Sequence, residues 1–136
     1  MSFLFDTSSL LLLIRSPHEE RKIEAIRDSK VLDLTYYEIG NALWKESELL
    51  KILSRDELSK VVNAVVKCFE NIESIKLLGK DLTDILDIAR RERLSFYDSS
   101  FLYAAKKIGM TLVSEDEKLL RASKKHAKAQ TLQSLL

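Results

Sequence analysis

The chain has 136 residues, of which 46% are hydrophobic and 32% are charged, with a formal net charge of +1. This balance is typical of a globular chain and excludes disordered and fibrous classes. With three glycines and one proline, no stretch has the composition of a linker or repeat, so we expect one domain over residues 1–136.

Short apolar runs alternate with longer segments along the chain. The runs are SFLF at 2–5, KVLDL at 30–34, SIKLL at 74–78, TLV at 111–113 and AQTLQ at 129–133. The segments between them carry apolar residues at three-and-four spacing, which is typical of amphipathic helices. Residues 35–72 are expected to supply two consecutive helices. This alternation predicts an α/β fold, a three-layer α/β/α sandwich around a parallel sheet.

The N-terminal stretch MSFLFDTSSLLLLIRS superficially suggests a secretory signal. It has no basic segment at its start, and Asp6 interrupts the apolar residues. The longest apolar run is too short to span a bilayer, so no membrane contact is expected. The single cysteine, Cys68, cannot form an internal disulfide, which fits a reducing compartment. We therefore expect a cytoplasmic protein.

Four acids stand near the ends of the expected strands. Asp6 follows SFLF directly, Glu38 comes four residues after VLDL, and Asp116 comes three residues after TLV. Asp98 opens the helical segment YDSSFLYAAKK, which leads into a strand. Ligand sites in such sheets lie beyond the carboxyl ends of the strands. Several of these acids can therefore converge at one edge of the sheet.

Helix capping is the main alternative for each acid taken alone. Three segments fit or nearly fit the capping-box pattern: Thr35-x-x-Glu38, Ser95-x-x-Asp98 and Ser114-x-x-Glu117. A carboxylate in a first turn gains up to about 1 kcal/mol from the helix dipole. Asp6 could also cap a helix that begins in DTSS, although an acid beside an apolar strand is costly to bury without a partner.

Convergence of the acids would favour a metal site over separate caps. Carboxylates within several ångströms repel one another and are driven toward protonation unless a cation neutralises them. Oxygen ligands without Cys or His favour Mg²⁺ or Mn²⁺ over zinc, and the only histidines are His18 and His126. Such ions polarise phosphate and lower the pKa of bound water. The chemistry this predicts is metal-assisted hydrolysis of a phosphodiester.

Three stretches resemble the PIN domain family: FLFDTSSLL, LTYYEIGNALWK and LSFYDSSFLYAAKKIGMTLVSEDEKL. The size and the order of the motifs resemble the VapC-type toxin branch, and the resemblance covers essentially the whole chain. It implies an α/β/α fold with a central parallel sheet of about five strands. It also implies Mg²⁺- or Mn²⁺-dependent ribonuclease activity, frequent dimerisation and inhibition by a small antitoxin protein.

Position by position, the resemblance matches its four acids to Asp6, Glu38, Asp98 and Asp116. It implies that Asp6, Asp98 and Asp116 hold a first ion. Glu38 would complete that site or help to bind a second ion. The expected activity is an endoribonuclease that leaves a 5′-phosphate and a 3′-hydroxyl on its RNA substrate.

Three further residues are candidates for supporting roles. Ser8 matches the family's small hydroxyl two residues after the first acid, which can orient a ligand. Ser114 stands where the family usually has threonine. Asn41 lies on the helix face of Glu38 and could bond a ligand or that carboxylate, or be a half-exposed amide. Glu115 and Glu117 match no motif and are interpreted as solvated first-turn acids.

Other classes fit less well. Aspartyl-phosphate phosphotransferases usually need a second Asp two residues after the first, where this chain has Ser8. Dinucleotide binding would need a glycine-rich turn after a strand, and none is present. The remaining alternative is a non-catalytic PIN-like module that binds RNA or protein, against which the presence of all four acids argues.

Dimerisation is expected from the family resemblance. The stretch LLLLIR at 10–15, together with Trp44, offers apolar surface for a second copy of the chain. The alternative is that all of these side chains belong to the core.

Overall fold

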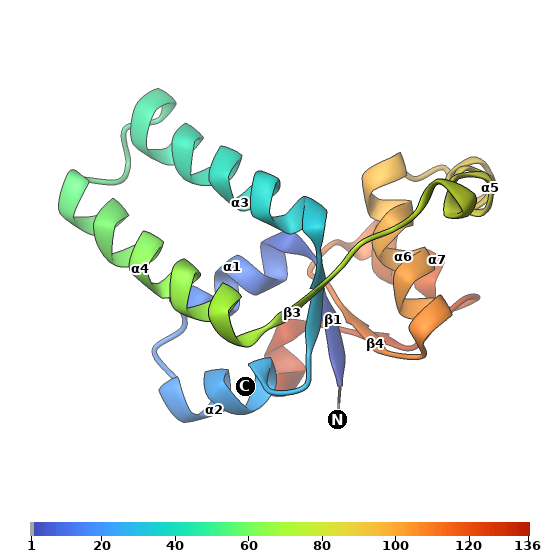
Figure 1. The fold of residues 1–136 in the computed structure, drawn as a ribbon, viewed down its shortest axis with the longest axis horizontal. Coiled ribbons are helices and arrows are strands. Elements are labelled where there is room, and N and C mark those ends of the chain that lie inside the picture. Colours follow the sequence, from blue (N-terminus) through green and yellow to red (C-terminus); the bar gives the residue numbers. More distant parts are fainter. Residues whose placement is uncertain (1) are drawn as a thin grey trace.

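The structure, a computed structural model, describes residues 2–136 and is built around a five-stranded parallel sheet (Figure 1). The strand order is β3-β2-β1-β4-β5, with β1 at the centre. The strands are β1 Phe3–Phe5, β2 Lys30–Leu32, β3 Glu73–Ile75, β4 Thr111–Val113 and β5 Ala129–Gln130. Each lies on one of the predicted apolar runs or overlaps it. Every neighbouring pair is parallel, so the carboxyl ends of the strands share one edge of the sheet.

Helices connect the strands and cover both faces of the sheet. The α-helices are α1 Thr7–Arg15, α2 Glu19–Ile26, α3 Asp33–Trp44, α4 Arg55–Asn71, α5 Leu82–Glu92, α6 Phe96–Ile108 and α7 Glu117–Ser123. A π-helical turn at Lys45–Leu49 continues α3, and 3₁₀ turns lie at Gly79–Asp81 and Leu132–Leu135. The crossover from β2 to β3 contains the two consecutive helices expected there, α3 and α4.

Alternate strand residues enter two separate cores. One face of the sheet contributes Phe3, Phe5, Val31 and Val113 to a cluster with α1, α3 and α4. The other face contributes Leu4, Leu32 and Leu112 to a cluster with α5, α6 and α7. Strands buried on both faces read as continuous apolar runs rather than alternating ones, as these do. The three-layer α/β/α sandwich is confirmed.

Of the three predicted capping boxes, the one at α6 is partly present. Ser95 caps α6 by accepting the backbone N–H of Asp98 at 3.0 Å. The box at Thr35 is wrong, because α3 already begins at Asp33 with no side-chain cap and Thr35 is buried inside the first turn. Glu38 consequently lies in the second turn of α3 rather than the first.

The predicted box from Ser114 to Glu117 is also wrong. Helix α7 begins only at Glu117, and Asp116 takes the cap position instead. Glu115 therefore precedes the helix, and its carboxylate accepts the backbone N–H of Leu132. Glu115 is exposed as expected but lies outside the first turn, whereas Glu117 is an exposed first-turn acid as expected.

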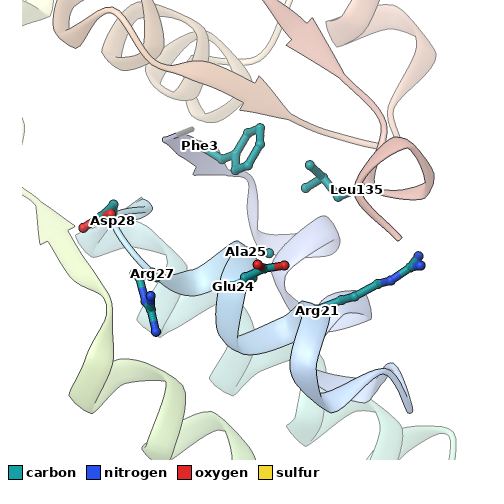
Figure 2. Close-up of a pocket in the computed structure, with 7 residues that line it drawn as sticks. All are labelled: Phe3, Arg21, Glu24, Ala25, Arg27, Asp28 and Leu135. Carbon is teal, nitrogen blue, oxygen red and sulfur yellow. The ribbon is translucent and has the colours of Figure 1, made fainter.

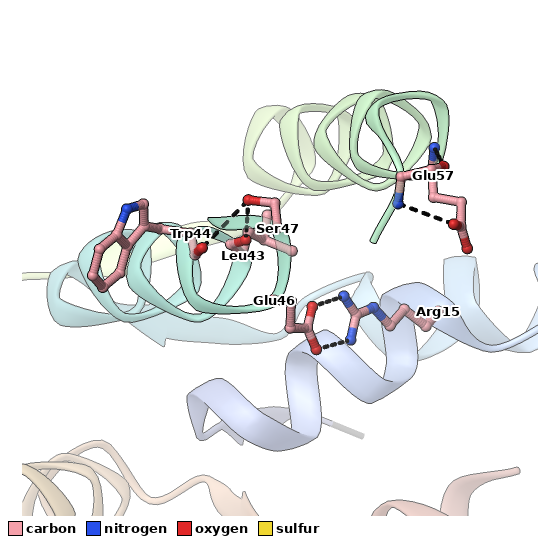
Figure 3. A network of polar contacts seen from close by, with 7 residues as sticks. Arg15, Leu43, Trp44, Glu46, Ser47 and Glu57 are labelled. Carbon is pink, nitrogen blue, oxygen red and sulfur yellow. Dashed lines mark hydrogen bonds and ion pairs between the residues drawn. The ribbon is translucent and has the colours of Figure 1, made fainter. Parts of the chain in front are cut away.

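Two polar contacts fix the helices that surround the sheet. Arg15 at the end of α1 donates through both terminal guanidinium nitrogens, Nη1 and Nη2, to the carboxylate of Glu46 in the π-helical turn (Figure 3). On the other side of the sheet, buried Asp81 accepts the Tyr103 hydroxyl at 2.6 Å and the Lys107 ammonium at 2.9 Å. No helix in the described part of the chain combines the length and apolar character that crossing a membrane requires.

Candidate active site

Asp6 lies directly beyond the central strand and caps the helix that follows. Its side chain is buried, and its Oδ1 accepts the backbone N–H of Ser9 at 2.9 Å, so α1 begins at Thr7. Its own N–H donates to the carbonyl of Val113 on β4 at 3.0 Å. The Ser9 hydroxyl donates to that same carbonyl at 2.8 Å. Asp6 is therefore fixed to β4 as well as to α1.

Asp116 holds the equivalent place after β4. Its Oδ1 accepts the backbone N–H of Leu119 at 2.9 Å, which caps α7. Its own N–H donates to the hydroxyl of the fully buried Ser114 at 3.1 Å. A carboxylate offers about four lone-pair sites, so one cap bond leaves acceptor capacity on Asp6 and on Asp116.

Glu38 and Asp98 approach the same edge from helices. Both side chains are partly buried. Glu38 in α3 accepts the hydroxyl of Thr7 through its Oε1 at 2.6 Å. Asp98 is the third residue of α6, where its backbone N–H is already bound by Ser95.

Electrostatic coupling joins these acids into one cluster. The pKa of Asp6 is raised, first by burial and further by the negative charge of Asp116, while hydrogen bonds from Ser114 and Ser9 act against the shift. The pKa of Asp98 is also raised, first by burial and then by the charges of Asp116 and Asp6. Asp6 and Asp98 are therefore each close enough to another acid for that neighbouring charge to disfavour their ionised forms.

Glu38 belongs to the same cluster. Burial raises its pKa most strongly, and the charges of Asp98 and Asp6 raise it further, against the hydrogen bond from Thr7. The four predicted acids, which span residues 6 to 116, thus gather at one edge of the sheet. We refer to Asp6, Glu38, Asp98 and Asp116 as the acidic cluster.

The donor set of the acidic cluster suits a hard divalent cation, since every side chain in it offers only carboxylate oxygen. Within residues 2–136, no group of three or more His, Cys, Asp or Glu side chains is arranged closely enough to hold a metal ion. Carboxylates repel one another in the absence of a counter-charge, and each would be stabilised in its ionised form by a cation. The oxygen donors of the cluster therefore fit a hard divalent cation by their chemistry, although their spacing in this structure is too wide to hold one.

The predicted supporting residues differ in their placement. Ser114 is buried beside Asp6 and Asp116, as described above. Ser8 and Asn41 are both exposed, and neither side chain forms a hydrogen bond within the described residues. The hydroxyl that bonds Glu38 belongs to Thr7, which sequence reasoning missed. Its position next to Asp6, at the start of a helix, was the available signal.

Two cavities formed by the described residues lie away from the acidic cluster. One is a small pocket at the amino end of β1, lined by Phe3, Arg21 and Leu135 among others (Figure 2). The other lies between α2 and α4 and includes Ile23 and Cys68. Burial raises the pKa of the Cys68 thiol to about 11, which suits a small core residue better than a nucleophile. None of the four acids lines either pocket.

Comparison with known proteins gives the family. The sequence pattern of the PIN domain matches residues 3–125. The chain belongs to the PIN domain family. Its similarity to two relatives named VapC covers 97% and 88% of the chain, which places it in the VapC-type branch that the sequence motifs resemble.

These two relatives come from Pyrobaculum aerophilum. Exonuclease VapC9 is 33% identical over 132 residues, covering 97% of this chain and 93% of the relative. Ribonuclease VapC3 is 28% identical over 123 residues, covering 88% and 92%. The crystal structure of PAE2754 from the same organism superposes with a TM-score of 0.80 at 31% identity, over 99% of this chain and 92% of that one. The PIN fold is therefore confirmed by sequence and by structure.

Proposed function

We propose that this protein is a Mg²⁺- or Mn²⁺-dependent endoribonuclease that acts in the cytoplasm as the toxin of a type II toxin–antitoxin pair. The observation that carries the proposal is the electrostatic coupling of four carboxylates beyond the carboxyl edge of a parallel sheet. The nuclease names of its VapC relatives support the same reaction class. Hydrolysis of RNA phosphodiesters is the activity that these observations jointly favour.

In this proposal Asp6, Asp98 and Asp116 hold the first ion, and Glu38 completes that site or helps to bind a second. When bound, the ion would supply charge stabilisation at phosphate and a water molecule activated for in-line attack. The carboxylates of the chain bind and orient the ion. Asp6 and Asp116 suit this task because their helix caps restrict how far each side chain can rotate.

Buried hydroxyls contribute to the orientation of these acids. Ser114 bonds the backbone of Asp116 and also stabilises the charged form of Asp6. Its role is the one that the family's usual threonine would have. Because raised pKa values disfavour the charged cluster in the free protein, a divalent cation gains affinity as the pH rises and the carboxylates ionise.

The position of the cut requires its own test, because one relative is named an exonuclease and the other a ribonuclease. A covalently closed circular RNA has no ends, so an endoribonuclease cuts it and an exonuclease does not. We would incubate circular and linear forms of one RNA with the parental protein, with Mg²⁺ or Mn²⁺ and with EDTA. Ordered loops and unstructured stretches should both be present in this RNA.

The matched variants are Asp98→Asn and Asp56→Asn. Both replace a first-turn aspartate by its amide, but only Asp98 belongs to the acidic cluster. We expect circular RNA to be opened by the parental protein and by Asp56→Asn in Mn²⁺, and by neither in EDTA. Asp98→Asn should leave it intact. Cleavage by Asp98→Asn at the parental rate would refute the assignment of the site. If the parental protein cleaved only the linear RNA, the proposed activity would be that of an exonuclease rather than an endonuclease.

The proposed partners are RNA, a small antitoxin protein and a second copy of this chain. RNA binding without cleavage by a folded, Mn²⁺-loaded protein would favour the non-catalytic PIN-like module instead. For the dimer, the structure separates the apolar candidates. Leu10, Leu11, Leu13 and Ile14 are core residues, whereas Leu12 is 51% and Trp44 is 49% exposed.

A further inference from the structure

Two threonine hydroxyls form a hydrogen-bonded series that ends at the carboxylate of Glu38. The Thr7 Oγ1 lies 2.6 Å from Glu38 Oε1 and 3.1 Å from Thr35 Oγ1. Thr7 is the first residue of α1, and Thr35 lies three residues before Glu38 on α3. Thr35 is fully buried and Thr7 partly so. The contact thus joins two helices whose starts lie at the acid-bearing edge of the sheet (Figure 1).

The number of available protons determines which group donates in each of these two hydrogen bonds. Thr7 has one hydroxyl proton and two oxygen neighbours, and an ionised Glu38 can only accept. The shorter contact, to the carboxylate, has the length of a charge-assisted O–H···O bond. Thr7 therefore donates to ionised Glu38, and the Thr35 hydroxyl must donate to Thr7. Thr35 in this way keeps the proton of Thr7 directed at the carboxylate.

The backbone of Thr7 is itself fixed by the first acid. Asp6 caps α1, which places Thr7 at the first helical position. The Thr7 hydroxyl has a defined direction because a β-branched side chain has few rotamers and because its oxygen contacts both Glu38 and Thr35. Holding Oε1 leaves the second oxygen of Glu38 available, so the contact orients the side chain without using all its acceptor sites.

We infer that Thr7, supported by Thr35, is a positioning residue that orients Glu38 toward a divalent cation held with Asp6, Asp98 and Asp116. This inference rests on the proposed function. It assigns to Thr7 the ligand-orienting part that the family resemblance gave to Ser8, a residue that is exposed here and makes no hydrogen bond within the described residues. Groups that orient metal ligands typically change metal affinity by about 10–100-fold when they are removed.

The test is a Mn²⁺ titration by isothermal calorimetry at neutral pH in the absence of RNA. The variants are Thr7→Val, which keeps the side-chain shape without the hydroxyl, Thr7→Ser, which keeps the hydroxyl, and Thr35→Val. Thr83→Val is the matched control, since Thr83 is an exposed threonine on α5. Thermal unfolding of each variant checks that it is folded, and Thr35→Val gives a second measurement that leaves the start of α1 unchanged.

We expect Thr7→Val to weaken Mn²⁺ binding by about tenfold or more, and Thr35→Val by a smaller factor. Thr7→Ser should stay within about threefold of the parental affinity, because the hydrogen bond is restored. Thr83→Val should bind as the parental protein does. Parental affinity in folded Thr7→Val would overturn the inference. A loss of Mn²⁺ affinity in Ser8→Ala that Thr7→Val does not share would also overturn it.

Calorimetry also separates this inference from the proposed function. A parental protein that binds Mn²⁺ but never cuts RNA would refute the nuclease, while the role of Thr7 would still be judged on Mn²⁺ affinity alone. A parental protein that binds no Mn²⁺ at all would overturn both.

Discussion

Asp6 and Asp116 cap the helices that follow two paired strands in the same way. Each side chain accepts the backbone N–H of the residue three positions later at 2.9 Å. The strands before them, β1 and β4, lie side by side in the sheet. Each acid is therefore part of the fold and part of the acidic cluster. A substitution can remove one of these contributions and keep the other.

Asp6→Asn and Asp6→Ala should separate the two. Asparagine caps a helix about as well as aspartate, whereas alanine loses about 1 kcal/mol, or about 4 °C in melting temperature for a chain of this size. Both variants should lose RNA cleavage by about three orders of magnitude, equivalent to about 4 kcal/mol. Calorimetric melting and Mn²⁺-dependent cleavage measure the two effects. Parental cleavage by folded Asp6→Asn would contradict the metal-ligand assignment.

The acidic cluster should make stability depend on pH in a defined direction. The pKa values of Asp6, Glu38 and Asp98 are raised in the folded state, so that state holds these protons more tightly than the unfolded chain. Unfolded carboxyls ionise near pH 4. The stabilisation is thus complete below that pH and is lost as pH rises through the raised values.

Urea unfolding between pH 4 and pH 8 tests this direction. The free energy of unfolding of the parental protein should fall with rising pH relative to Asp98→Asn, which lacks one of the charges. Taking the difference between the free energies of unfolding of the two proteins cancels the contributions of titrating groups outside the cluster. A difference that does not change over this range would mean that Asp98 is not coupled to the cluster.

Asp81 should show the opposite pH dependence. The Tyr103 hydroxyl and the Lys107 ammonium hold the pKa of this carboxyl well below its usual range. Its contribution to stability is therefore present above pH 4 and is lost as the pH falls through the lowered value. Asp81→Ala should lower the melting temperature at pH 7, and the loss should shrink in acid. Asp84→Ala, an exposed neighbour in the first turn of α5, is the control.

The proposed dimer predicts a change in mass for Trp44→Lys. Trp44 at the end of α3 is 49% exposed, and Arg15 and Glu46 tie this region to α1 (Figure 3). A charge on this surface should convert twice the chain mass into the chain mass of 15.6 kDa in light scattering. Leu86→Lys on α5, which is 51% exposed in the parental protein, should leave the mass unchanged. A parental monomer at micromolar concentration would remove the dimer.

The toxin assignment predicts an effect on growth. Expression of the parental protein should slow growth, and Asp98→Asn at a matched expression level should not, because it lacks one of the proposed ligands. Co-expression of a small neighbouring open reading frame should relieve the effect by supplying the antitoxin. Growth curves with and without that frame measure both. Harmless expression of folded parental protein would favour a housekeeping role.

Much of the fold could be predicted from the sequence because its signals are local. The apolar runs at residues 2–5 and 111–113 are flanked by helical patterns, so β1, β4 and their parallel arrangement follow from periodicity. The exact residues at which the helices begin could not be predicted from this periodicity. Thr35 has the capping hydroxyl pattern, yet β2 ends at Leu32 and α3 begins at once, which buries Thr35 inside the helix.

For the candidate site, strand order was the missing information. The four acids were predicted as residues, but their mutual approach depends on β1 lying between β2 and β4, which no local pattern specifies. The contact between Thr7 and Glu38 spans 31 residues. It depends on how α1 and α3 pack, so Ser8 was chosen from the motif. Ser114, by contrast, directly follows β4 in the sequence, and its buried hydroxyl accepts the backbone N–H of Asp116.

The order of the strands also sets the moment at which the acidic cluster can exist. Of the five strands of the sheet, the one that comes first in chain order, β1, takes the middle, and its partner β4 follows more than a hundred residues later. A ribosome that stalls before Asp116 leaves a chain with one acid missing and the central strand unpaired on one side. Chemistry that needs all four acids is therefore withheld from translation products that end before Asp116.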